Sequence, residues 1–321
     1  MSDSLASGAE QPMFGRIALI GLGLIGSSLA RAIKRHGLAG TLVACDASAG
    51  VIERVRELGL ADIASTDAGD AVRDADLIVL CVPVGATAAV GAQIAALLKP
   101  GAILSDVGSV KAAVVAALSP VLPSDVHLIP AHPVAGTEYS GPDAGFATLF
   151  TNRWCIVTPP EGADADAVAK VCAFWRAVGS NVETMAPARH DLVLAITSHV
   201  PHLIAYNIVG TAAHMESVTR SEVIKFSAGG FRDFTRIAAS DPTMWRDVFL
   251  HNKDAVLEML GRFNEDLAAL QRMIRWGDGD GLFDLFSRTR AIRRGIIAQG
   301  QETAAADFGR SAAAPAAQES A

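Results

Sequence analysis

The sequence has little charge, few aromatic residues and no paired cysteine motif. Of its 321 residues, 19% are charged and 6% aromatic, whereas 50% are hydrophobic. None of the four cysteines belongs to a C-x-x-C motif and each lies in an apolar run, which predicts buried free thiols in a reducing compartment. A formal net charge of −7 and a pI near 5.6 argue against a nucleic acid or an anionic membrane as a partner.

Long uninterrupted apolar runs are also missing. No run reaches the roughly eighteen residues that a membrane-spanning helix needs, and residues 1–12 lack the apolar segment of a signal peptide. We therefore expect a cytoplasmic protein, and the chain length is comfortable for two domains. The polar ends, residues 1–13 and 301–321, are predicted to be disordered.

The first strong pattern is a glycine-rich turn between a strand and a helix. Arg16–Ile20 is an apolar, partly β-branched strand that runs directly into Gly21–Gly26, with the spacing G-x-G-x-x-G. A helical pattern then continues to Gly37, and a second strand, Thr41–Cys45, ends at Asp46. In this context the spacing predicts a dinucleotide-binding turn, in which the pyrophosphate lies on the helix N-terminus.

Asp46 indicates which dinucleotide is bound. It follows Gly26 by 20 residues, where a carboxylate accepts hydrogen bonds from the ribose hydroxyls, and Ala47–Ala49 contains no cation for a 2′-phosphate. NAD is therefore favoured over NADP. Further along, Pro83 either lines the nicotinamide or only ends its strand, and Ser109 is either a helix N-cap or a ligand contact. The predicted cofactor contacts are Gly21, Gly23, Leu24, Ile25, Gly26, Asp46, Pro83 and Ser109.

Strand and helix patterns alternate up to Asn181–Thr184, which we expect to complete the sheet. This alternation predicts an α/β Rossmann-type, doubly wound parallel sheet over residues 14–186. Lys111, taken alone, reads as a solvated charge. Beyond residue 186 the strand patterns stop, and residues 187–300 are predicted to form an all-α domain.

A histidine follows the apolar run His127–Pro130, which reads as the end of a strand. His132 would therefore lie at the carboxyl edge of the sheet, where ligands bind, and begin the loop Ala131–Gly141. A neutral imidazole there can accept a proton near pH 7. The alternative is a histidine that only packs or caps this loop.

The predicted helical domain contains a second group of polar residues. Pro201 should kink the helix at Ser198–His202, and His199 and His202 share one face. A metal site lacks a third ligand there, so contact with an organic ligand is favoured and no metal is expected. Ser240–Pro242 reads as a helix start. The long apolar helices have more hydrophobic surface than one small bundle can bury, which predicts a homodimer.

Taken together, these segments resemble the prephenate/arogenate (cyclohexadienyl) dehydrogenases of tyrosine biosynthesis. The resemblance runs from Arg16 to Arg294 and rests on the motifs Gly21–Ser27, Ser105–Lys111, Ala131–Gly141, Ser198–His202 and Phe231–Trp245. It implies NAD-dependent oxidative decarboxylation of prephenate or arogenate. The resemblance leaves three questions open: which of the two substrates is preferred, how strictly NAD is required, and whether tyrosine inhibits the enzyme.

The resemblance also implies roles for individual residues. His132 matches the catalytic histidine, and Ser109 matches the serine that binds the reacting hydroxyl. Arg236 matches the arginine that anchors a substrate carboxylate, which suits a fixed bidentate cation. One of His199 and His202 contacts the substrate, and we favour His202. The remaining matches that line or organise the pocket are Thr137, Glu138, Asp233 and Trp245.

Two other function classes compete with this assignment. One is another NAD(P)-dependent dehydrogenase of similar layout, of the β-hydroxyacid or pyrroline-carboxylate type, which would lack His132 followed by the Ala135–Glu138 loop. The other is a non-catalytic NAD-binding regulator. A regulator has no need of a proton acceptor, a hydroxyl and an arginine together.

Overall fold

The computed structural model describes residues 11–137, 139–219 and 228–298. Glu138 lies outside these residues. Of the two segments predicted to be disordered, 301–321 and residues 1–10 of the segment 1–13 also lie outside them. The chain divides into two compact units, the first ending at Met259 and the second beginning at Leu260. The domain boundary predicted after residue 186 falls inside the first unit and stays a prediction.

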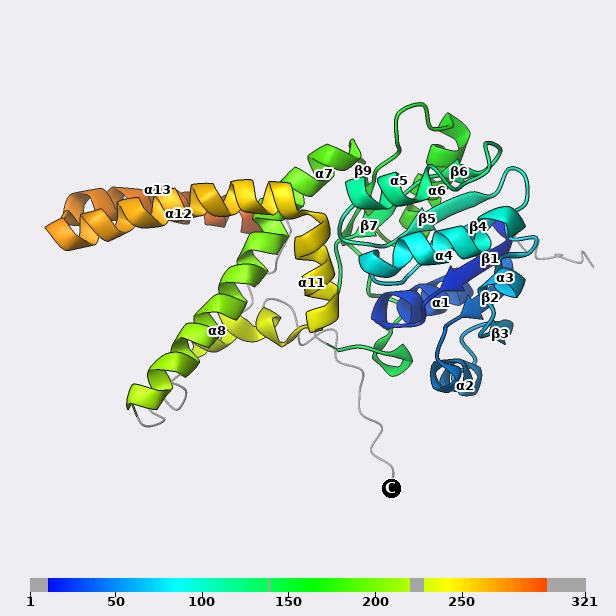
Figure 1. Ribbon diagram of the computed structural model, residues 1–321, viewed down its shortest axis with the longest axis horizontal. Helices are drawn as coiled ribbons and strands as arrows, with labels where there is room; N and C mark the ends of the chain where they lie inside the picture. Colours follow the sequence, from blue (N-terminus) through cyan, green and yellow to red (C-terminus); the bar gives the residue numbers. More distant parts are fainter. Residues whose placement is uncertain (1–10, 138, 220–227, 299–321) are drawn as a thin grey trace, which may run out of the picture. The chain divides into compact units, whose positions relative to one another are not determined.

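A six-stranded parallel sheet is the centre of the first unit (Figure 1). Its order is β3-β2-β1-β4-β5-β6, which reverses direction between β1 and β4 as in dinucleotide-binding folds. The strands are β1 (Phe14–Ile20), β2 (Ala39–Cys45), β3 (Ile63–Ser65), β4 (Leu77–Leu80), β5 (Ile103–Asp106) and β6 (His127–Leu128). The predicted Rossmann-type sheet is confirmed.

Helices cover both faces of this sheet because its strands are apolar on both sides. In β1, Ile17 and Leu19 belong to one buried cluster, whereas Ala18 and Ile20 belong to the other. The helices and short 3-10 turns of this part are α1 (Leu24–His36), α2 (Ala49–Glu57), α3 (Ala68–Val72), η1 (Val84–Ala86), α4 (Thr87–Ile94), η2 (Ala95–Leu97), α5 (Ala112–Leu118), η3 (Pro142–Ala144) and α6 (Ala165–Ala177).

The last three strands form a separate sheet, so the expectation that Asn181–Thr184 completes the parallel sheet was wrong. The order is β7 (Ala131–Pro133), β8 (Trp154–Val157) and β9 (Asn181–Thr184). β7 and β8 are antiparallel, whereas β8 and β9 are parallel. Pro130 has no N–H to continue the ladder of β6, and its carbonyl instead accepts the backbone N–H of Thr158 at 2.8 Å. The chain therefore changes sheet just before His132.

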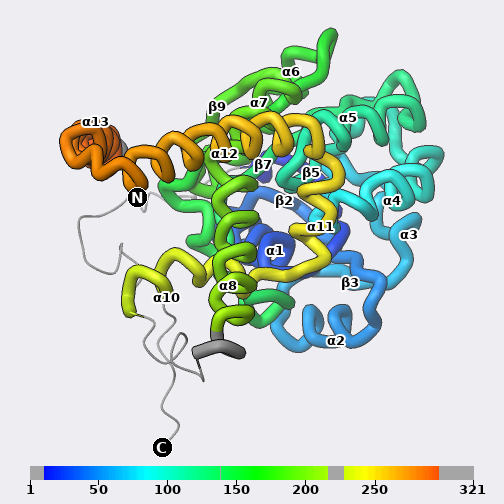
Figure 2. Tube along the Cα trace, turned by 60° about the vertical axis from the view of Figure 1, so that its left-hand side comes forward, coloured from blue at the N-terminus to red at the C-terminus, as the bar shows by residue number. Residues whose placement is uncertain are grey.

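After β9 the first unit is helical. Its elements are α7 (Pro187–Leu194), η4 (Ala195–His199), α8 (Val200–Thr219), α10 (Gly229–Thr235), η5 (Arg236–Ala239) and α11 (Pro242–His251). The predicted interruption takes the form of a π-helical turn, η4, between α7 and α8, and Pro201 lies in the first turn of α8. α8 lies beside η5, where the Tyr206 hydroxyl donates to the carbonyl of Ser240 at 2.9 Å (Figure 2). The predicted helix start at Ser240–Pro242 is confirmed, because the Asp241 side chain caps α11.

Two long helices complete the described chain, α12 (Lys253–Trp276) and α13 (Gly279–Ala298). Their connection uses Gly277 in the left-handed conformation, with φ of 67°. Within the second unit, large apolar side chains are exposed, namely Leu267, Ile274, Trp276, Phe283, Phe286 and Ile292. This unit therefore presents hydrophobic surface that its own residues do not cover.

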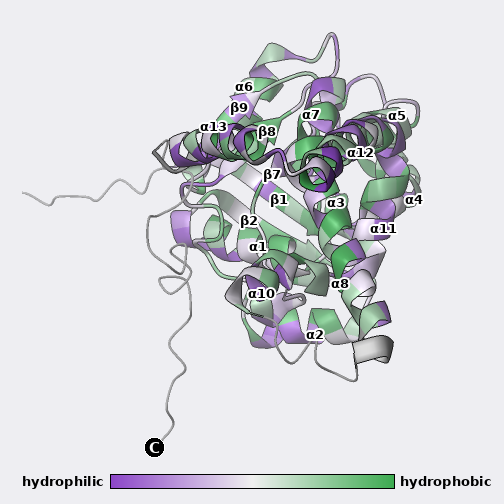
Figure 3. Ribbon diagram, turned by 90° about the vertical axis from the view of Figure 1, so that its left-hand side faces the viewer, coloured by the Kyte–Doolittle hydropathy of each residue, from purple (hydrophilic) through white to green (hydrophobic). Residues whose placement is uncertain are grey.

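One helical stretch, Pro187–Met215, is long and apolar enough to cross a membrane. The stretch has 29 residues and is coloured by hydropathy in Figure 3. Its most apolar 18-residue window has a mean hydropathy of 1.5, and 28% of that window is buried. The sequence-based exclusion of such a helix was therefore too strong, because it required an uninterrupted apolar run. A single helix of this kind is weak evidence for a membrane, since core helices of soluble proteins have the same composition.

Candidate functional site

The predicted cofactor residues gather at the carboxyl edge of the parallel sheet. The glycine turn follows β1, Asp46 follows β2, Pro83 follows β4 and Ser109 follows β5. Because neighbouring parallel strands end at the same edge, these residues come together although they are far apart in sequence.

The three fingerprint glycines have different structural roles. Gly21 has φ of +97°, and an added Cβ would lie 2.5 Å from the carbonyl oxygen of Cys81. An added Cβ at Gly26 would collide with the carbonyl oxygen of Gly21. At Gly23, by contrast, nothing lies within 4 Å of an added Cβ, and no side chain caps α1. The open space over Gly23 and the uncapped first turn at Leu24 and Ile25 fit a pyrophosphate.

Asp46 is held beside this turn by backbone donors. Its carboxylate accepts the N–H of Leu22 and the N–H of Ser48, each at 2.9 Å. Ser48 in turn caps α2 through its hydroxyl. The exposed Pro83 precedes η1 at the end of the neighbouring strand β4. These residues fit NAD, and the position of Asp46 at the end of β2 is where a ribose-binding carboxylate is expected.

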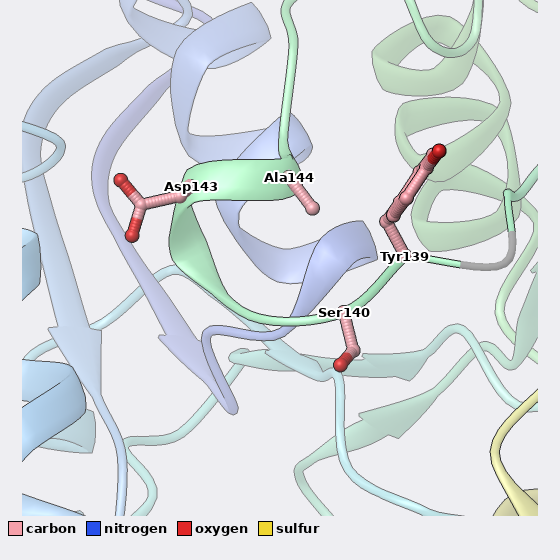
Figure 4. Close-up of a pocket in the computed structure, with 4 residues that line it drawn as sticks. All are labelled: Tyr139, Ser140, Asp143 and Ala144. Carbon is pink, nitrogen blue, oxygen red and sulfur yellow. The ribbon is translucent and has the colours of Figure 1, made fainter.

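The loop after His132 folds back onto α1 and α2. Pro142 accepts a hydrogen bond from Arg31 at 3.2 Å, and Asp143 forms an ion pair with Arg54 at 2.6 Å. A shallow hollow of about 550 Å³ lies along this loop, lined by Tyr139, Ser140, Asp143 and Ala144 (Figure 4). The side chains of Tyr139 and Asp143 point in different directions in this view. The loop thus joins the histidine segment to the side of the unit that holds the dinucleotide turn.

His132 lies inside strand β7, not in the loop after a strand end as expected. Its partner across the antiparallel pair is Ile156, and its side chain is only 7% exposed. Its Nδ1 lies 2.8 Å from Nε2 of His190, which is fully buried. The two rings are edge to face, with centroids 5.1 Å apart. The pairing of β7 with β8 therefore fixes the backbone position of His132.

His190 connects His132 to a buried carboxylate. Its Nδ1 lies 2.8 Å from Oδ1 of Asp191. That carboxylate also accepts the backbone N–H groups of Lys111 at 2.8 Å and Ala112 at 2.9 Å, where α5 begins. Both oxygens of Asp191 are therefore hydrogen-bonded, and the start of α5 is joined to α7.

Lys111 is fully buried, so the reading of it as a solvated charge was wrong. Its ammonium donates to Asp106 at 2.5 Å and to the carbonyl of Ala131 at 2.8 Å, next to His132. Burial lowers the pKa of Lys111 and raises the pKa of Asp106, and the contact between the two groups opposes both shifts. The pair ties the end of β5 to β7.

The second group of residues lies on η4, α8 and α11. His202 stacks on Trp245 with ring centroids 3.7 Å apart, and its Nδ1 lies 2.8 Å from the carbonyl of Ser198. His199 is fully buried, and its Nδ1 lies 3.1 Å from Nδ2 of Asn252. The same amide nitrogen donates to the backbone carbonyl of Asp191 at 2.9 Å. His199 is thus part of the structure around Asp191, while His202 is half-buried on an aromatic surface.

The other predicted substrate residues differ in exposure. Arg236 is half-buried at the start of η5 and close enough to His202 to contribute to lowering its pKa. Asp233 is exposed on α10. Thr137 is exposed, and its hydroxyl accepts the backbone N–H of Tyr139 at 3.3 Å. Glu138 lies outside the described residues.

All the histidines of this site are shifted towards their neutral form. Burial lowers the pKa of His132 well below 6.5, and repulsion from His190, Lys111 and His199 adds to the effect. Burial lowers the pKa of His199 to about 4, although the backbone of the half-buried Ser109 opposes this shift. Burial also lowers the pKa of His190. At neutral pH, His132 is therefore an uncharged base.

Sequence reasoning missed His190, Asp191 and Asn252. His190 and Asp191 lie in the first turns of α7, where a polar pair reads as an ordinary helix start. A usable signal was their position a few residues after residue 186, where the strand patterns stop. Asn252 ends α11 and gave no such signal.

Comparisons with known proteins decide the family. Residues 29–184 match the nucleotide-binding domain of prephenate dehydrogenase, and residues 186–288 match its dimerization domain. The chain belongs to the prephenate dehydrogenase family. The resemblance predicted from the motifs is confirmed.

Relatives of this family cover nearly all of the described chain. A cyclohexadienyl dehydrogenase of Zymomonas mobilis is 44% identical over 88% of this chain and 96% of its own length. The structure of prephenate dehydrogenase from Aquifex aeolicus, in complex with hydroxyphenyl propionate and NAD+, has a TM-score of 0.82 and 32% identity over 88% of this chain and 98% of that one. An arogenate dehydrogenase from Synechocystis has a TM-score of 0.75 and 28% identity, over 88% and 99% of the two chains. The predicted cofactor, NAD, is confirmed for this prephenate dehydrogenase family member.

Proposed function

We propose that the chain catalyses the NAD-dependent oxidative decarboxylation of prephenate, arogenate or both, in tyrosine biosynthesis. The observation that carries this assignment is His132, a buried and uncharged histidine beside an NAD-binding sheet edge. Cyclohexadienyl, prephenate and arogenate dehydrogenases are all among the relatives of the chain.

His132 and Ser109 would both act at the ring hydroxyl of the substrate. Bound NAD supplies the hydride acceptor. His132 takes up the proton of the ring hydroxyl as hydride departs, and the ring carboxylate leaves as carbon dioxide. Ser109 binds the same hydroxyl. The driving force comes from formation of the aromatic ring, so the protein mainly positions groups and removes one proton.

Binding of the substrate falls to the second group of residues. Arg236 anchors a carboxylate, because an always-charged guanidinium can grip it with two parallel hydrogen bonds. His202 is half-buried, stacks on Trp245 and lies close enough to Arg236 for the guanidinium to contribute to lowering its pKa. Thr137, Glu138 and Asp233 would line or organise the pocket.

The experiment that tests this function measures NADH formation with prephenate and arogenate offered separately. Turnover with NAD on either compound is the expected result, and the ratio of the two kcat/KM values gives the substrate preference. Repeating the assay with NADP tests the role of Asp46, which should disfavour a 2′-phosphate. If NAD binds but neither compound is turned over, the assignment is wrong and a different dehydrogenase or a regulator is favoured.

We also infer that the chain forms a homodimer through its helical part, and that it acts in the cytoplasm. The matched dimerization domain and the exposed side chains of Leu192, Val193 and Ile196 on α7 and η4 support the dimer. Sedimentation should give twice the chain mass of 33.3 kDa. Val193→Glu with Ile196→Glu should give monomers, whereas Val121→Glu, at an equally exposed valine before β6, should not.

A further inference from the structure

The hydrogen bonds of His132 continue beyond the residues assigned to the reaction. His132, His190 and Asp191 form a chain in which the two linking distances are each 2.8 Å. All three side chains are buried, with exposed fractions of 7%, 0% and 5% for the residues. A buried polar chain of this kind costs stability unless every member is hydrogen-bonded.

The donors around Asp191 determine where the protons lie. Its carboxylate accepts the backbone N–H groups of Lys111 and Ala112, and these groups can only donate. Because both oxygens of Asp191 already accept a backbone N–H, its contact with His190 is read as a third accepted hydrogen bond, from Nδ1–H of His190. Neutral His190 then has a lone pair on Nε2, so Nδ1 of His132 must carry the proton between the two rings. This leaves Nε2 of His132 unprotonated.

We propose that His190 and Asp191 are positioning residues that hold His132 in the tautomer able to accept the substrate proton. The role rests on the proposed function, since it concerns the group that removes the hydroxyl proton. The two residues would act through His132 and would not touch the substrate. A histidine with the opposite tautomer would present an N–H to the substrate and could not act as the base.

The hydrogen bonds to His190 and Asp191 also stabilise His132 after His132 has accepted the proton. The cation on His132 then donates through Nδ1 to His190, whose other nitrogen faces the charge of Asp191. On other elements, the charged groups nearest to these three hydrogen-bonded side chains are Lys111 and Asp106, which pair with each other. Asp191 is therefore the carboxylate whose charge is available to the new cation.

A pair of substitutions at His190 separates positioning from packing. His190→Gln keeps an oxygen that can accept Nδ1–H of His132, whereas His190→Phe keeps the ring volume without an acceptor. We expect kcat to fall by about 100-fold in the Phe variant and to be at least about tenfold higher in the Gln variant than in the Phe variant, with NAD affinity unchanged in both. The matched control is His127→Gln, because His127 lies on β6 and is not part of the hydrogen-bonded series His132–His190–Asp191. This variant should keep full activity. If packing alone mattered, the apolar Phe would be the better replacement, and equal or reversed rates would overturn the proposal.

A measurement without substrate decides the tautomer itself. In the ¹⁵N NMR spectrum of the free protein, His132 should carry its proton on Nδ1 near neutral pH. In Asp191→Asn, the amide can donate to Nδ1 of His190, which would reverse both rings and move the His132 proton to Nε2. A wild-type protein with the proton on Nε2 would refute the proposal even if prephenate and arogenate are turned over. Conversely, failed turnover with the expected tautomer would count only against the proposed function.

Discussion

The dinucleotide end and the histidine end of the site are formed by different parts of the polypeptide. The dinucleotide end is made of backbone, with Gly23 leaving open space and Asp46 held by two N–H groups. The histidine end is made of side chains, and His132 gains its environment from α7, from the start of α5 and from β5. The first end depends on the absence of side chains, whereas the second depends on a complete set of hydrogen-bonded ones.

This difference indicates how each end should respond to substitution. In a site built from backbone, an added side chain should change NAD binding or stability without changing the protonation of His132. A network of buried side chains controls protonation, so changes there should appear in kcat and in pH dependence. The predictions that follow test whether the two ends separate in this way.

The largest effect is expected for His132→Asn. Asparagine cannot accept the hydroxyl proton, so kcat should fall by about 10³-fold, while the Kd of NAD should not change. Steady-state kinetics and calorimetric titration with NAD measure the two quantities. Unchanged turnover would remove His132 from the mechanism, and a large loss of NAD affinity would contradict the separation of the two ends.

Arg236→Ala should mainly raise KM for the substrate. Loss of hydrogen bonds between charged groups costs about 1.5–3 kcal/mol, which corresponds to roughly 10- to 150-fold. Arg236→Lys should fall between the wild type and the alanine variant, because it keeps the charge without the bidentate geometry. A KM that does not respond to either substitution would place the carboxylate elsewhere.

Two glycine variants test the dinucleotide end. Gly23→Ala should bind NAD about tenfold more weakly at an unchanged melting temperature, since its Cβ meets no protein atom. Gly26→Ala should instead lose about 1–3 kcal/mol of stability, because its Cβ would collide with the carbonyl oxygen of Gly21. Thermal unfolding with and without NAD distinguishes the two. Equal NAD affinity in Gly23→Ala and the wild type would show that the pyrophosphate lies elsewhere.

The last prediction concerns stability at acidic pH, where no residue is replaced. His199 has a pKa of about 4 in the folded protein and an ordinary value near 6.5 when unfolded, so the unfolded state binds more protons between these values. The free energy of unfolding should therefore fall as the pH is lowered from 7 to 5, by about 2 kcal/mol from His199 alone. Urea unfolding at both pH values measures the loss, which His199→Gln should reduce. A pH-independent stability would mean that His199 is not desolvated.

The sequence predicts the dinucleotide end of the site better than the histidine end. The fingerprint glycines and Asp46 are local patterns, with a strand, a turn and a helix in a fixed order, and the structure places them as predicted. The sequence also pointed to His132 as a candidate base, but it did not show that β7 leaves the parallel sheet. Pairing between strands is non-local, and the missing N–H of Pro130 acts only once Thr158 is beside it.

The histidine network was invisible for a similar reason. Lys111 reads as a surface charge until Asp106 and the carbonyl of Ala131 surround it. His190 is separated from His132 by 58 residues, and no spacing rule connects them. Single residues with polar side chains become recognisable as a network only after the fold has brought their partners within hydrogen-bonding distance.

The π-helical turn η4 sets the rotation of α8 about its axis relative to α7. It lies between α7, which carries His190 and Asp191, and α8, which carries His202 and Tyr206. Each residue added to or removed from a helix rotates the following part by about 100°. Removing one residue from this turn would thus leave the composition of the chain almost unchanged while turning His202 away from Trp245. The length of a five-residue segment therefore determines whether the two histidine groups face one site.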